Sequence, residues 1–323
     1  MRRTRNARKK ERGPADAILV SDLHLTDSTP VSRTDDYMKA QKHKLQFLKS
    51  LSQENNNCPI LCAGDVFDHW KASPWLCSFA FRYLPKPFIT IPGQHDLPEH
   101  SLKQWSRSAL PLLSFFDETM IISSEIEGWE NTGRLLILGK PYGTLKDFGP
   151  DRIPNFPYLP AYRKVLILHE LVWKGRRPSW DKGKGSWTDK ELLNKFGEHF
   201  DLILTGDNHE GFVTRKGNCL LVNPGSVMRR TADQANYQPR CYLYYAVEND
   251  VEPVYFPIAM GVHTREHIDR RKERDERIAA YIERMKINWE IGLSFKRNLE
   301  AYLEENSVPQ KVREIIWQHL ETI

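Results

Sequence analysis

The sequence predicts an α/β fold, and three observations point to it. Short apolar runs alternate with helix-like segments, without a repeat of fixed period. Runs such as residues 17–20 and 135–138 are apolar throughout, as expected for strands of a sheet that is covered on both faces. The later runs are closely spaced and hairpin-like, which predicts a second, partly antiparallel sheet.

The predicted elements before residue 260 follow the chain in this order. Strands are expected at residues 17–20, 59–62, 88–91, 135–138, 165–168, 202–204, 212–214, 220–222, 241–247 and 251–256. Helices are expected at residues 34–54, 102–116 and 188–198.

The composition changes near residue 262. A segment of dense mixed charge leads into three apolar sets at helical spacing, which Gly292 and Pro309 separate. The sets are Ile278, Tyr281, Ile282 and Met285; Phe295, Leu299, Tyr302 and Leu303; and Val312, Ile315, Ile316 and Leu320. We therefore expect residues 261–323 to form a helical segment that binds a partner or caps the core.

The net charge of the chain comes from its beginning. Residues 1–12 hold seven basic residues and one acidic residue, a net of +6. The net charge of the whole chain is +5, so the charges of the remaining residues sum to −1. The overall charge of this remainder therefore does not indicate nucleic-acid binding. We expect residues 1–14 to be a disordered basic tail, either simply solvated or in contact with nucleic acid or anionic lipid, and residues 15–260 to be the catalytic domain.

Two classes of protein are excluded. No apolar run approaches the roughly 20 residues that a membrane helix needs, which excludes transmembrane spans. The five cysteines show no CxxC or paired spacing, which argues against a disulfide scaffold or zinc ribbon. They favour reduced thiols and a cytoplasmic location.

Five predicted strands end in side chains that bind metals or transfer protons. These side chains are Asp22 and His24; Asp65 and Asp68; Gln94 and His95; His169; and Asp207 and His209. A single histidine after a strand is more often structural, but here the pattern recurs at strand after strand, and such ends are where α/β sheets build sites. Carboxylate, imidazole and amide ligands suit Mn, Fe or Zn, while the absence of thiolate disfavours structural zinc.

These motifs resemble the calcineurin-like metallophosphoesterase superfamily, whose pattern is DxH, GDxxD, GNHD/E, a lone His and GHxH. The resemblance covers residues 15–260 and implies a four-layer α/β/β/α sandwich. It also implies two divalent cations that activate a hydroxide for attack on phosphorus. Carried over residue by residue, Asp22, His24, Asp65 and His209 would bind the first ion. Asp65 would bridge to a second ion held by Gln94, His169 and Asp207. His95 would face the scissile phosphate, with Asp68 holding its imidazole.

Two positions depart from the family pattern, and both belong to the second ion. Gln94 replaces asparagine, and Asp207 replaces the first histidine of GHxH. The second site is then either weakened or retuned. More oxygen ligands would favour Mn²⁺, or alternatively Mg²⁺, over Zn²⁺.

Within the superfamily, the chain is most similar to the SbcD-type double-strand-break repair nuclease subunit. Residues 93–98 read GQHDLP, close to the GNHDxP form of these nucleases. The loop after His169 contains tryptophans interspersed with lysines and arginines, which makes it a candidate DNA-binding lip. Alternatively, the tryptophans pack within the loop and the charges are simply solvated. Its candidate residues are Trp173, Lys174, Arg176, Arg177, Trp180, Lys182 and Lys184.

The expected function is a metal-dependent DNA nuclease, exo- or endonucleolytic, in DNA repair, recombination or phage DNA processing. The resemblance implies that the terminal helices dock onto an SMC-like ATPase, and it allows a homodimer. The segment after residue 260 is too small for a separate DNA-capping domain followed by a long linker, which fits a compact viral or prophage version. The alternatives are a phosphodiesterase or phosphatase acting on a small nucleotide, or a degenerate, non-catalytic interaction module.

Overall fold

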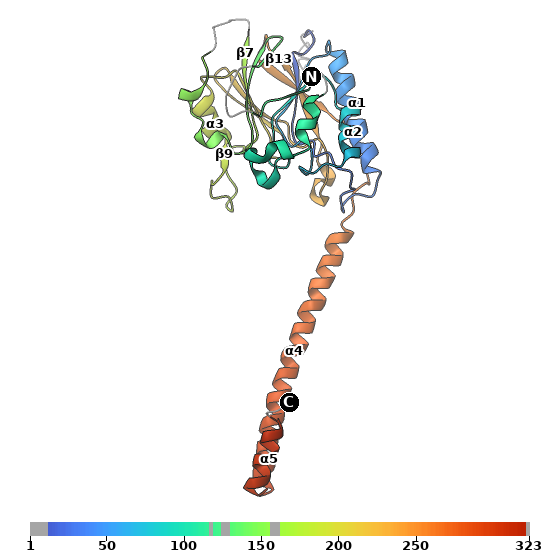
Figure 1. The fold of residues 1–323 in the computed structure, drawn as a ribbon, viewed down its shortest axis with the longest axis vertical. Helices are drawn as coiled ribbons and strands as arrows, with labels where there is room; N and C mark the ends of the chain where they lie inside the picture. Colours follow the sequence, from blue (N-terminus) through green and yellow to red (C-terminus); the bar gives the residue numbers. More distant parts are fainter. Residues whose placement is uncertain (1–11, 116–118, 124–129, 156–161, 321–323) are drawn as a thin grey trace, which may run out of the picture. The chain divides into compact units, whose positions relative to one another are not determined.

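The computed structural model describes residues 12–115, 119–123, 130–155 and 162–320. The chain divides after Thr264 into two compact units, each with its own internal contacts. Most of the predicted basic tail, residues 1–11, lies outside the described residues. The first unit holds the two sheets, and the second holds the terminal helices (Figure 1).

The first sheet has six strands in the order β14-β13-β1-β2-β3-β4. Their bounds are β1 (Ala17–Val20), β2 (Ile60–Cys62), β3 (Phe88–Thr90), β4 (Thr119–Ile121), β13 (Arg240–Tyr245) and β14 (Asp250–Tyr255). Strands β1 to β4 run parallel, whereas β13 pairs antiparallel with both β1 and β14. The carboxyl ends of β1, β2 and β3 therefore lie along one edge.

The second sheet also has six strands, in the order β11-β12-β10-β7-β6-β5. Their bounds are β5 (Glu130–Thr132), β6 (Leu135–Lys140), β7 (Arg163–Leu168), β10 (Leu202–Thr205), β11 (Phe212–Lys216) and β12 (Cys219–Asn223). The four inner strands are parallel, and β5 and β11 close the edges antiparallel. A separate parallel pair joins β8 (Leu171–Trp173) to β9 (Ser186–Thr188).

Alternate side chains of each strand serve two different cores. In β1, Leu19 packs between the sheets with residues such as Val165, while Ile18 faces the outer helices. Helices α1 (Tyr37–Glu54) and α2 (Pro74–Tyr83) cover the first sheet, and α3 (Asp189–Phe196) covers the second. The predicted four-layer α/β/β/α sandwich is confirmed (Figure 1).

Some predicted elements differ from the structure. Instead of one helix at 102–116, the chain forms two short 3₁₀-helices, η2 (Leu102–Arg107) and η3 (Leu110–Phe115). In η3 the buried residues are Leu110 and Leu113, three apart, which suits the three-residue turn of a 3₁₀-helix. Helix α2 was not predicted, although Ser73 caps it by accepting a hydrogen bond from the Leu76 N–H. Strands β4, β5, β8 and β9, three residues each, were also missed.

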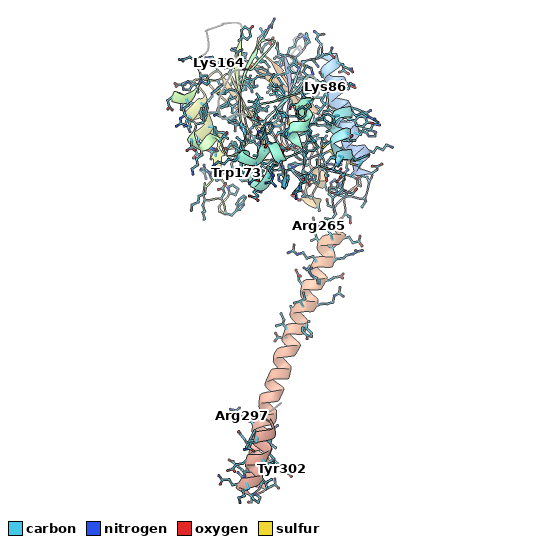
Figure 2. All side chains as sticks on the ribbon, viewed as in Figure 1. Lys86, Lys164, Trp173, Arg265, Arg297 and Tyr302 are labelled. Atoms are coloured by element: carbon cyan, nitrogen blue, oxygen red, sulfur yellow. The ribbon has the colours of Figure 1, made fainter. Side chains whose placement is uncertain are left out.

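The second unit consists of α4 (Glu266–Glu305) and α5 (Gln310–Leu320). Helix α4 continues through Gly292, so the predicted break there is wrong; a glycine costs an exposed helix only about 1 kcal/mol. The second predicted break is confirmed, because the chain turns before Pro309. Leu303 is buried within this unit, while Tyr281 and Ile315 are exposed. Figure 2 labels Arg297 and Tyr302 on the last turns of α4.

Two findings bear on the surroundings of the protein. Among the residues that the structure describes, no helix is both long and apolar enough to cross a membrane. The five cysteines are unpaired and buried. A cytoplasmic location stays a prediction.

Candidate metal centre

The predicted ligands meet at the carboxyl ends of five strands. Asp22 follows β1, Asp65 follows β2 and His169 follows β7, yet these three side chains offer donor atoms within 4.8 Å of one another. Their side chains are at most 1% exposed. The two sheets thus combine their ends into a single buried site.

The first group of ligands lies around Asp22. The Nε2 atoms of His24 and His209 are 3.2 Å apart, and each is 3.8 Å from Asp22 Oδ1. Ligands bound about 2.0–2.2 Å from one ion have donor atoms separated by roughly 3–4 Å. The spacing of these atoms fits a single divalent cation.

Asp65 lies between this group and a second one. Its Oδ2 atom is 3.8 Å from His24 Nε2 and 3.3 Å from His169 Nε2. Both Asp65 Oδ2 and His169 Nε2 are buried without a hydrogen-bond partner. Buried polar atoms nearly always have a hydrogen-bond partner. A neighbouring carboxylate oxygen and imidazole nitrogen without one therefore indicate a place for a cation. The donor set therefore fits divalent metal on both sides of Asp65.

The second group contains the two positions that depart from the family pattern, and they bind each other. The Gln94 Nε2 donates to Asp207 Oδ1 at 2.8 Å. Burial raises the pKa of Asp207, and the nearby Asp22 and Asp65 carboxylates raise it further, against the pull of His169. The structure thus brings both substituted residues to the site as a hydrogen-bonded pair.

Four of the candidate ligands have a strained backbone. Asp22, His24, Asp65 and Asp207 have φ angles of 52°, 43°, 52° and 70°, in the left-handed region that side chains disfavour. Such conformations persist only where surrounding contacts enforce them. Here the Asp22 N–H donates to the Gly64 carbonyl at 3.2 Å, and the His24 N–H donates to the Asp65 carbonyl at 2.9 Å.

Two glycines allow the loops to approach this closely. A Cβ atom on Gly93 would lie 2.2 Å from Asp65 Oδ1, and one on Gly206 would lie 2.7 Å from His169 Nδ1. Neither contact is sterically possible. The glycines that begin the GQHD and GDNH motifs are therefore required by packing against the ligands.

Two histidines are oriented by main-chain carbonyls. His169 Nδ1 lies 2.6 Å from the Ala63 carbonyl, and His95 Nδ1 lies 2.8 Å from the Asp68 carbonyl. Because a carbonyl can only accept, each Nδ1 carries the hydrogen. Nε2 of His169 is then free to bind metal, and Nε2 of His95 is the atom that can gain or lose a proton.

Asp68 holds His95 through its main chain, and its carboxylate serves other partners. Asp68 Oδ1 is 3.5 Å from His24 Nδ1 and forms an ion pair with Arg230. Burial lowers the pKa of His24, but the nearby carboxylates of Asp68, Asp65 and Asp22 outweigh burial and raise it. Asp68 therefore positions a ligand of the first group as well as His95.

Sequence reasoning missed Arg230, and it gave Asp96 only a supporting place beside the ligands. Arg230 lies in the loop after β12, and a lone loop arginine carries no recognisable signal. Asp96 accepts main-chain hydrogen bonds from Val66, Phe67 and Gly93 at 3.2, 2.9 and 3.0 Å. Burial and the Asp65 charge raise the pKa of Asp96 to about 7. Asp96 thus ties the second and third ligand loops together.

The structure separates the predicted DNA-binding residues into two kinds. Trp173 and Arg177 are engaged with other side chains: Trp173 Nε1 donates to Asp181 Oδ2 in the loop at 2.6 Å, and Arg177 Nη1 donates to Glu191 Oε1 on α3 at 3.0 Å. The residues with exposed side chains are Lys174, Arg176, Trp180, Lys182 and Lys184. In Figure 2, Trp173 and Lys164 lie at opposite ends of the sheets, which places Trp173 at the end where β7 reaches His169.

Comparisons with known proteins agree with this geometry. Residues 17–211 match the family profile described as calcineurin-like phosphoesterase. The DNA double-strand break repair protein Mre11 of Methanosarcina mazei is 26% identical over 170 residues, 48% of this chain and 23% of that protein. The chain thus matches about a quarter of that relative's length.

Solved structures are similar to the chain at low identity. TT1561 of Thermus thermophilus is 14% identical with a TM-score of 0.44, over 75% of this chain and 99% of that one. A novel archaeal phosphodiesterase is 13% identical with a TM-score of 0.38, over 74% and 99%. The family profile covers more than half of the chain and contains all the ligand positions, so the chain belongs to the calcineurin-like phosphoesterase family of metal-dependent hydrolases.

Proposed function

We propose that this protein hydrolyses phosphodiester bonds in DNA, with Mn²⁺ as the favoured ion and Mg²⁺ as the alternative. The observation that carries the proposal is the convergence of two ligand groups on Asp65, with His95 beside them. His95 shares a 4.8 Å donor cluster with His24 and Asp65. Bound divalent ions would supply an activated water and neutralise phosphate charge.

The residues have distinct tasks. Asp22, His24 and His209 would hold the first ion, and Gln94, His169 and Asp207 the second, with Asp65 in contact with both. His95, its Nδ1 hydrogen committed to Asp68, would carry a proton on Nε2 to the departing oxygen. Arg230, paired with Asp68, adds positive charge beside the site, where a phosphodiester would bind.

Three features favour DNA as the substrate. The GQHDLP segment is similar to the corresponding motif of repair nucleases. The Mre11 relative carries a DNA-repair name. The exposed Trp180 and four exposed basic residues lie in the loop between β8 and β9, one short strand after His169. Exposed rings together with basic side chains can bind a polynucleotide.

A nuclease assay tests the proposal. Labelled single- and double-stranded DNA is incubated with Mn²⁺, Mg²⁺ or Zn²⁺, using wild type, His95→Ala and the control His199→Ala. His199 is an exposed histidine on the segment before β10, away from the ligands. We expect metal-dependent cleavage that is lost by about 10²-fold or more in His95→Ala and retained in the control.

Other outcomes would contradict the proposal. Hydrolysis of bis-nitrophenyl phosphate without cleavage of any DNA would indicate a small nucleotide substrate. Inactivity on both substrates, with no metal binding by calorimetry, would indicate a degenerate interaction module.

We also propose that the terminal helices dock onto an SMC-like ATPase. Their exposed apolar side chains include Ile278, Tyr281, Tyr302 and Ile315. Replacing Ile315 and Ile316 by Asp should abolish co-purification with the candidate ATPase, whereas Glu314→Lys on the same helix should not. Binding that persists in the double variant would contradict the docking proposal.

A further inference from the structure

A groove separates the two helices that cover the first sheet. Its volume is about 560 Å³, within the range of pockets that hold nucleotide-sized ligands. The α1 wall contributes Lys39, Lys42 and His43, and the α2 wall contributes Trp75 and Arg82. None of these residues belongs to the metal centre.

Aromatic rings form a ladder along the α2 wall. Trp75 stacks on Phe79 with ring centroids 5.8 Å apart and planes 23° from parallel, and Phe79 contacts Tyr83 at 5.0 Å. Phe79 is buried and supplies the contact with the core, while Trp75 is 55% exposed. Trp75 therefore presents a ring to the groove beyond what packing of the helix requires.

The charge of the groove is positive. Among the residues that line it, three are basic and one is acidic, whereas α3 carries two residues of each sign. The Lys42 ammonium lies 4.8 Å from the Tyr83 ring centroid. Asp36, the acid lining the groove, is engaged in capping α1, because its Oδ1 accepts from the Lys39 N–H at 2.9 Å. The helices of one face are thus basic in a domain that is not basic overall.

The groove begins at the same edge as the metal centre. Helices α1 and α2 both start after loops that leave the carboxyl ends of β1 and β2, where Asp22 and Asp65 lie. Between Asp65 and α2, the ring of Trp70 has the Lys71 ammonium 4.6 Å from its centroid. Rings and cations thus occur from the ligand loop to the groove.

We propose that the groove between α1 and α2 binds a single-stranded polynucleotide segment that extends from the metal centre. Exposed aromatic rings stack on nucleobases, and clustered basic side chains neutralise phosphates. This combination binds single strands without recognising their sequence. This inference rests on the proposed nuclease function, and it names a second contact region besides the β8–β9 loop.

Binding is tested separately from hydrolysis. Fluorescence anisotropy of a labelled oligothymidylate is measured over a range of salt with the full chain in chelator, so that no strand is cut. Trp75→Ala removes the ring, and Lys39→Glu with Arg82→Glu reverses two groove charges. The control pair, Lys49→Glu with Lys190→Glu, reverses two exposed lysines outside the groove. Circular dichroism melting checks that each variant is folded.

We expect Trp75→Ala to weaken binding about 10-fold. The groove pair should weaken it about 10-fold or more and reduce the slope of log affinity against log salt by about 1.4. The control pair should change affinity less than about 3-fold. Equal losses of affinity in the groove pair and the control pair would show that only the overall charge of the protein matters, and would overturn the inference. The inference would also be overturned if polyglutamate displaced the labelled strand as effectively as unlabelled oligothymidylate does.

The two proposals fail in different ways. Wild type that binds through the groove but cuts no DNA with any metal would refute the nuclease function and leave the groove assignment standing. Wild type that cuts DNA, with groove variants that bind like wild type, would refute the groove assignment alone.

Discussion

The two halves of the candidate metal centre share Asp65 and the loop after β10, but they differ in chemistry. Around Asp22, the residues His24 and His209 supply imidazole nitrogens whose closest contact is with each other, at 3.2 Å. On the other side of Asp65, Gln94 and Asp207 supply oxygen and amide groups joined at 2.8 Å. The comparison teaches that the departures from the family pattern form one unit, because each substituted side chain is the partner of the other.

The largest effect should come from the residue that both halves share. Asp65→Ala removes the carboxylate between His24 and His169, so hydrolysis of bis-nitrophenyl phosphate should fall by at least about 10³-fold. Calorimetry should show loss of Mn²⁺ binding in both halves, while Asp151→Ala, an exposed control, keeps it. One full-affinity ion remaining in Asp65→Ala would mean that the halves are independent.

A substitution that replaces no ligand should act through the same carboxylate. Gly93→Ala places a Cβ 2.2 Å from Asp65 Oδ1, and the loops must separate to relieve the clash. We expect about a 10²-fold loss of hydrolysis and a lower melting temperature. Gly13→Ala, which meets nothing within 4 Å, is the matched control. Wild-type activity in Gly93→Ala would show that Asp65 tolerates displacement.

Removing one ligand from each half measures how unequal the halves are. Asp22→Ala strips the half that keeps the family ligands, and Asp207→Ala strips the half that departs from them. We expect Asp22→Ala to be about 10-fold less active than Asp207→Ala, because Asp22 also accepts the Asp207 N–H at 3.2 Å. The number of ions bound at saturating Mn²⁺ reports whether an ion is lost from each variant. Equal losses of activity in both variants would show that the two halves contribute equally.

The smallest effect, and the most specific, concerns metal preference. Gln94→Asn and Asp207→His each break the 2.8 Å pair, so their effects should not be additive. Together they restore the family's asparagine and histidine, and we expect the ratio of Mn²⁺ to Zn²⁺ affinity to fall about 5-fold. Competition calorimetry measures the ratio. Additive single effects would show that the two residues act separately.

The sequence predicts most of the strands and groups the candidate ligands, because both depend on local pattern. A buried strand is a short apolar run, and the side chains after it fall at the sheet edge whatever the rest of the chain does. That is why Asp22, Asp65 and His169, far apart in the chain, could be grouped from their positions after strands alone.

What the sequence could not predict depends on contacts across the fold. The Gln94–Asp207 hydrogen bond joins residues 113 positions apart, and the Arg230–Asp68 pair joins two loops. Trp173 was expected to be available for stacking on nucleobases, but its Nε1 donates a hydrogen bond to Asp181 in the following loop. Gly292 was expected to end a helix, yet a single glycine does not outweigh the residues around it.

The left-handed backbone at Asp22, His24, Asp65 and Asp207 sets fold stability and chemistry against each other. At each position, glycine would relieve a conformational cost of about 1 kcal/mol, while deleting the ligand. A screen that selects only for resistance to heat should therefore enrich glycine at those positions where the relieved cost exceeds that of the lost side-chain hydrogen bonds, such as the one that Asp22 accepts from the Asp207 N–H. A screen that selects for turnover must reject the same changes, so the strained residues mark where the chain gives up stability for function.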